Sequence, residues 1–92
     1  MRYDGRAGRR MDVGYKEFRK AVLRRDKHKC QMPGCDRKRG LIVHHIQTYA
    51  HAATLRVDPD NGITLCKGCH YLIRKQEVHY APLFLSIVGE NK

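Results

Sequence analysis

The feature that most constrains this 92-residue chain is the placing of its four cysteines in two close pairs. Cys30 and Cys35 enclose four residues, Cys66 and Cys69 enclose two, and thirty residues separate the pairs. Two short turns of this kind bring four thiolates together around a tetrahedral zinc ion from distant parts of a small chain. We therefore predict a structural Zn²⁺ on these four cysteines.

Two disulfides are the alternative use of the same thiols. They form in oxidising compartments, whereas paired cysteines in a reducing cytosol are typical of metal sites. The basic N-terminal residues have no apolar stretch behind them, unlike a secretory signal, and no segment reaches the ~18 uncharged apolar residues that cross a bilayer. We expect a cytoplasmic protein without membrane contact, whose small core depends on the metal.

The charge of the chain indicates a polyanionic partner. Nineteen Lys and Arg residues against nine Asp and Glu residues give a formal net charge of +10. Counterion release then predicts an affinity for nucleic acid that falls steeply with salt. Composition does not distinguish DNA from RNA.

The order of predicted elements indicates a small α+β fold. Residues 1–12 are predicted as a flexible basic arm and residues 13–92 as one domain. Apolar steps of three and four predict an amphipathic helix over 15–26, and aliphatic runs predict strands at 41–46 and 63–65. A long loop is expected between the strands, and a helix from the second cysteine pair to about residue 78. The apolar tail is expected to pack on the domain, either as strand or as helix.

Three histidines are placed where chemistry is feasible. His44 and His45 are adjacent at the end of a predicted strand, so they point to opposite sides and do not share one task. His70 directly follows Cys69, and a hairpin packed on its helix brings it near that strand end. Two imidazoles with room for water and a phosphate oxygen make an open metal site of the catalytic kind. Ordinary hydrogen-bonded histidines are the alternative.

Two segments together resemble a known motif. VHHI at residues 43–46 and DNGITLCKGCH at residues 60–70 are similar to the HNH endonuclease motif. The similarity is to the variant whose ββα-metal (His-Me finger) core, a two-stranded hairpin packed on a helix, is stapled by a four-cysteine zinc site. VLRRD at residues 22–26 and Cys30 resemble the preceding helix and first zinc knuckle of that variant. The resemblance covers about residues 15–75 and implies that residues 13–92 are a single HNH nuclease domain.

The resemblance implies a catalytic role for four residues. His45 would be the general base that takes a proton from water. His44 and His70 would hold one divalent cation (Mn²⁺, Ni²⁺, Co²⁺, Zn²⁺ or Mg²⁺) on the scissile phosphate. Asn61 would pin the long loop, so that His45 presents the correct nitrogen. The implied reaction is hydrolysis of a DNA phosphodiester to 5′-phosphate and 3′-hydroxyl ends, by nicking with weak sequence preference.

Two positions depart from the commonest family pattern. His44 stands where many members have Asp or Glu, and Arg74 stands where some have another His. An imidazole in place of a carboxylate softens the site, so we predict that Mn²⁺, Co²⁺, Ni²⁺ or Zn²⁺ binds more tightly than Mg²⁺. Arg74 cannot ligate a metal, but it can reach a phosphate.

DNA is the partner that the resemblance implies. A non-catalytic, zinc-stapled nucleic-acid-binding module is the alternative function, since its charge would be the same. Small HNH proteins of this type resemble those of bacteriophages that act beside the packaging machinery (terminase), which would place the protein in the host cytoplasm. We expect a monomer, with a dimer through the apolar tail as the alternative. A solvated surface is the alternative for the basic face of the first helix and for Arg74. The cations assigned to the DNA backbone are Arg9, Arg10, Lys16, Arg19, Arg56 and Arg74.

Overall fold

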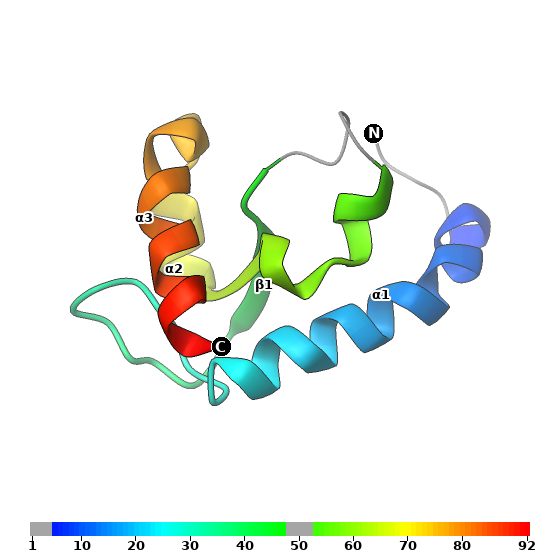
Figure 1. Cartoon of the computed structure of the whole chain (residues 1–92), viewed down its shortest axis with the longest axis horizontal. Helices are drawn as coiled ribbons and strands as arrows, with labels where there is room; N and C mark the ends of the chain where they lie inside the picture. Colours follow the sequence, from blue (N-terminus) through cyan, green and yellow to red (C-terminus); the bar gives the residue numbers. More distant parts are fainter. Residues whose placement is uncertain (1–4, 48–52) are drawn as a thin grey trace.

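The computed structural model describes the backbone of residues 5–47 and 53–92, and the side chains of residues 14–47 and 55–92. Seven elements follow in the order α1 (Gly5–Arg25), β1 (Leu41–His45), η1 (Ala53–Val57), η2 (Pro59–Asn61), β2 (Gly62–Cys66), α2 (Lys67–Leu72) and α3 (Glu77–Asn91). Figure 1 shows the hairpin between α1 on one side and the α2 and α3 pair on the other. The predicted α+β fold, a two-stranded hairpin with helices and a four-cysteine cluster, is confirmed.

The first helix is longer than predicted. It begins at Gly5 rather than at residue 15, so the described part of the segment predicted as a basic arm is helical. Phe18 and Val22, four residues apart, are buried against the hairpin as the apolar period requires. The boundary between arm and domain at residue 13 stays a prediction.

The C-terminus of α1 is fixed by a Schellman motif. The amide of Lys27 donates to the carbonyl of Arg24, and the amide of His28 donates to that of Leu23. Lys27 and His28 both have left-handed backbone conformations, with φ of 58° and 54°. This reversal sends the chain back towards the hairpin, where Cys30 begins the first cysteine turn.

A buried ion pair joins this end of α1 to β2. The Arg25 guanidinium lies 2.8 Å from the carboxylate of Asp26, which also accepts a hydrogen bond from the amide of Thr64. Arg25 donates to the carbonyls of Pro59 and Gly62 as well. Asp26 is 1% exposed, and its carboxylate is hydrogen-bonded, as a buried charge requires. This pair fixes the start of β2 relative to α1.

The two strands of the hairpin are antiparallel, and the cysteines and the two adjacent histidines lie at opposite ends of it. Leu41 pairs with Cys66 at one end of the hairpin, and His45 pairs with Gly62 at the other. All five residues of β2 are buried, because helices cover both faces. One core, of Phe18, Val22 and Val43, lies under α1, and a larger one lies between the hairpin, α2 and α3.

The helix that follows the second cysteine pair is shorter than predicted. It ends at Leu72 rather than near residue 78, and Lys75, with a φ of 69°, redirects the chain. The tail then forms α3, in spite of Pro82. Phe84 and Val88 of α3 are buried in the larger core. Among the described residues no helix is both long enough and apolar enough to cross a membrane.

Candidate functional site

The four cysteines meet at one end of the hairpin. Cys30 and Cys35 flank a turn in which Gly34 has a φ of 87°, while Cys66 ends β2 and Cys69 lies in α2. Their Sγ atoms all lie within 4.8 Å of one another, and no disulfide joins them. Thiolates at ~2.3 Å from a tetrahedral zinc ion are about 3.8 Å apart, so the cluster fits a metal ion such as zinc with all four positions filled.

The thiols of this cluster differ in acidity. Burial raises the pKa of Cys30 and of Cys69. The backbone amide of Cys69, which donates to the Cys66 Sγ at 3.4 Å, lowers the pKa of Cys66 to about 7. A divalent cation would stabilise the thiolate form of all four residues.

His44 and His45 project to opposite faces of the hairpin. The ring of His45 stacks on Phe18 of α1, with ring centroids 5.0 Å apart and planes 7° from parallel. The ring of His44 lies on the other face, 5.3 Å from the ring of His70 and 5.7 Å from that of Phe84. Consecutive strand residues thus serve two different environments, as strand geometry requires.

The imidazole of His45 is held at one nitrogen. Its Nε2 lies 3.0 Å from the carbonyl oxygen of Arg56, which lies in the last turn of η1. A carbonyl oxygen only accepts, so Nε2 has the proton and Nδ1 has the lone pair in the neutral ring. The hydrogen bond and the stacking on Phe18 together fix the direction in which the lone pair of Nδ1 points.

Asn61 ties down both sides of the long connection between the strands. Its side-chain oxygen accepts from the amide of Gln47, and its Nδ2 donates to the carbonyls of Gln47 and Leu55. Gln47 follows β1 and Leu55 precedes the carbonyl that His45 contacts. The 4% exposed Asn61 side chain therefore sets the path of the loop that holds His45.

His44 and His70 have the features of a metal pair. His44 is 6% exposed, and its buried Nε2 has no hydrogen-bond partner among the described residues. A buried ring nitrogen without a hydrogen-bond partner lowers the stability of the fold unless a ligand binds it. Burial, and secondarily the neighbouring His70, lowers the pKa of His44 to about 4, so the ring is neutral, as a ligand must be. These residues fit a divalent cation.

Two supports of this site are not evident from the sequence. Gly62 is needed because a Cβ there would lie 2.7 Å from the Phe18 ring, the ring on which His45 stacks. In the sequence, Gly62 follows Asn61, and such a pair is typical of turns, so nothing marks Gly62 as a support of His45. The Arg56 carbonyl was missed because a main-chain atom leaves no side-chain signal.

The cations predicted to bind DNA have different settings. Lys16 is exposed and Arg19 half-buried on α1, and Arg56 is half-buried beside His45. Arg74 is exposed, with its guanidinium 4.7 Å above the ring of Tyr71. The side chains of Arg9 and Arg10 lie outside the described residues.

One comparison with known proteins gives a match. A family model described as HNH endonuclease matches residues 30–76, which include all four cysteines, the three histidines of the site and Asn61. Neither the curated proteins nor the solved structures include a significant match to the chain.

Proposed function

Because the chain belongs to the HNH endonuclease family, we propose that it hydrolyses phosphodiester bonds of DNA with the help of one divalent cation. The family model covers 47 of the 92 residues, from residue 30 to residue 76. The observation on which the proposal rests is the hydrogen bond from His45 Nε2 to the Arg56 carbonyl, since it places the proton of the neutral ring on Nε2 and the lone pair on Nδ1.

His45 acts as the general base in this proposal. Its Nδ1 takes a proton from a water molecule as the water oxygen forms a bond to phosphorus. The bond from phosphorus to the 3′ oxygen breaks, and the leaving oxygen takes a proton from solvent water, which gives a 3′-hydroxyl and a 5′-phosphate. The stacking on Phe18 and the bond to Arg56 orient the ring before substrate binds, so little reorganisation precedes the reaction.

His44 and His70 hold the catalytic cation in this proposal. When bound, the cation stabilises the charge that builds on the scissile phosphate and on the leaving 3′ oxygen. The imidazole pair favours Mn²⁺, Co²⁺, Ni²⁺ or Zn²⁺ over Mg²⁺, because imidazole is a softer ligand than carboxylate. His44 and His45 point to opposite faces of the hairpin, so metal binding by His44 does not compete with proton transfer by His45.

The four-cysteine metal has a structural role in this proposal. Cys69 precedes His70 directly, and Cys66 ends the strand that pairs with β1. A metal on these thiolates therefore fixes His70 against the strand that holds His44. With four sulfur ligands it has no open position for substrate.

Cations on the surface position the DNA in this proposal. Arg19 and Arg74 supply contacts to phosphates, which orient a duplex without reading its bases. Lys16 is four residues before Lys20 on the same face of α1, so it contacts phosphates farther from the cut. We propose nicking by a monomer with weak sequence preference. A partnership with a phage terminase and a dimer through the tail stay predictions from the sequence.

The proposal is tested with supercoiled plasmid and zinc-loaded protein in Mn²⁺, in Mg²⁺ and without added divalent cation. Metal-dependent conversion to the open circular form is expected. DNA ligase should reseal those nicks, because it requires the 5′-phosphate and 3′-hydroxyl ends that this mechanism produces. DNA binding without cleavage under any of the three conditions would instead favour the non-catalytic binding module.

A further inference from the structure

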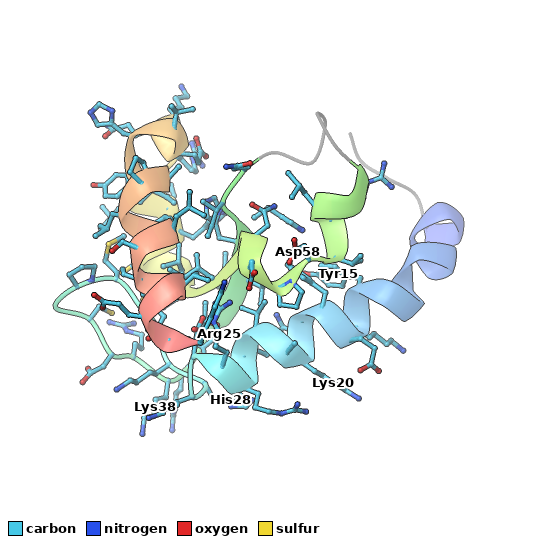
Figure 2. All side chains as sticks on the ribbon, viewed as in Figure 1. Tyr15, Lys20, Arg25, His28, Lys38 and Asp58 are labelled. Atoms are coloured by element: carbon cyan, nitrogen blue, oxygen red, sulfur yellow. The ribbon has the colours of Figure 1, made fainter. Side chains whose placement is uncertain are left out.

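A line of cations runs along the side of the molecule away from His45. We call this set the basic strip. Figure 2 shows two of its members, Lys20 and Lys38, along one edge of the molecule, with His28 between them. Four of its members are exposed and Lys29 is half-buried. Within the described part of the chain none of them forms an ion pair with a carboxylate. The strip consists of Lys20, Arg24, Lys27, Lys29 and Lys38.

Backbone hydrogen bonds make the strip continuous across three segments. Lys20 and Arg24 are four residues apart on α1, so they share one helix face. The Schellman motif places Lys27 directly beyond them. The amide of Cys30 donates to the carbonyl of Arg37 at 2.8 Å, which joins the segment of Lys29 to the loop of Lys38.

The strip faces away from the candidate catalytic residues. Phe18 stacks on His45, and Lys20, two residues further, lies about 200° around the helix axis from it. Lys38 precedes β1 whereas His45 ends it, and the strand of five residues spans about 13 Å. Phosphates held by the strip are therefore not the phosphates next to the bond that is cut.

Lys27 is at a position where the local backbone favours glycine. It is the first residue after the α1 C-cap and has a φ of 58°. Glycine is usual there because a Cβ is unfavourable in the left-handed conformation. Lys27 therefore places a charged side chain where the local backbone favours glycine, and strained positions of this kind cluster at functional sites.

The surface around the strip fits a phosphate backbone better than a protein. The large hydrophobic side chains that are exposed in the described residues are Val57, Tyr71, Leu72, Val78, Leu83 and Leu85, and none belongs to α1 or to the loop of Lys38. Protein interfaces have an apolar centre, whereas binding of nucleic-acid phosphates needs only suitably spaced cations.

We propose that the basic strip binds a second stretch of DNA backbone, on the side of α1 opposite to the cleavage site. This inference rests on the proposed function, because it assumes that DNA is the substrate. The strip raises the affinity for long duplexes without taking part in the chemical step. Loss of its charges therefore raises KM and leaves kcat unchanged.

The test compares two double variants of equal charge. Lys29→Gln with Lys38→Gln removes two cations of the strip, and Lys75→Gln with Lys92→Gln removes two exposed cations outside it. For the strip variant we expect KM on long duplex DNA to rise several-fold with kcat within about twofold of wild type. In the His45→Ala background, the slope of log Kd against log salt should fall by about two for the strip variant alone.

The variant Lys27→Gly distinguishes a loss of DNA binding from a loss of stability. Glycine relieves the left-handed backbone, so this variant should melt at a temperature at or above that of wild type. It should nevertheless bind DNA more weakly and with a smaller salt dependence. Strip variants whose KM and salt slope equal those of the control pair would overturn the inference, while a wild-type protein that cuts no DNA would overturn the proposed function instead.

Discussion

The Nε2 atom of His45 and the carbonyl oxygen of Arg56 lie 3.0 Å apart, although eleven positions separate the two residues in the sequence. The hydrogen bond exists only because the long connection between β1 and β2 follows one particular path. Asn61 sets that path through its bonds to Gln47 and Leu55. Asn61 is therefore as important for the proposed catalysis as His45 itself.

Replacing Asn61 by alanine should lower activity more than any other change to the loop. Asn61→Ala loses three hydrogen bonds, at about 1 kcal/mol each, and we expect kcat to fall about 10- to 100-fold as His45 loses its orientation. Plasmid nicking and thermal melting measure the two effects. Asn91→Ala is the matched control, because it loses bonds to Asp26 and Gln31 far from His45. Equal kcat for the two variants would contradict the role of Asn61.

Gly62 should tolerate no side chain. In Gly62→Ala the new Cβ would lie 2.7 Å from the ring of Phe18, which supports His45. We expect a loss of about 1–3 kcal/mol in the free energy of unfolding, together with a lower kcat. Gly89→Ala, where nothing lies within 4 Å, should be neutral or stabilising by up to about 1 kcal/mol because alanine favours a helix. Equal melting temperatures for the two alanine variants would show that the Phe18 ring leaves room for a Cβ at residue 62.

Much of this arrangement was predictable because side-chain patterns report directly on it. The cysteine spacing predicted the cluster, and the adjacent histidines predicted two faces. The tail was undecided, although Tyr80, Phe84 and Val88 have helical spacing, because Pro82 interrupts the pattern. The start of α1 was misplaced because its first residues have no apolar period. The Arg56 contact depends on a loop path that no local pattern specifies.

Removal of the cysteine-bound metal should unfold the protein. Zinc binding contributes about 10–16 kcal/mol in zinc-finger peptides, which is as large as the whole free energy of unfolding of a typical domain, about 5–15 kcal/mol. A strong chelator should therefore abolish the far-UV circular dichroism signal and the melting transition, and Cys66→Ser should do the same without chelator. An unchanged melting temperature after verified metal removal would contradict this prediction.

The preference for the catalytic cation should depend on His44. Isothermal titration of zinc-loaded protein should show Mn²⁺ bound more tightly than Mg²⁺, and His44→Asp should narrow that difference because a carboxylate is a harder ligand. His79→Asp, at an exposed position of α3, is the control and should leave the difference unchanged. Wild-type protein that binds Mg²⁺ as tightly as Mn²⁺ would be evidence against the imidazole pair.

The most direct test of the account is the cleavage activity of His45→Ala beside that of His28→Ala, an exposed histidine away from the site. Both variants are assayed with wild type on supercoiled plasmid in Mn²⁺, after melting curves and gel shifts have established folding and DNA binding. We predict that His45→Ala folds and binds DNA but does not nick it, while His28→Ala nicks at the wild-type rate. Nicking by folded His45→Ala at the wild-type rate would contradict the assignment of His45 as the general base.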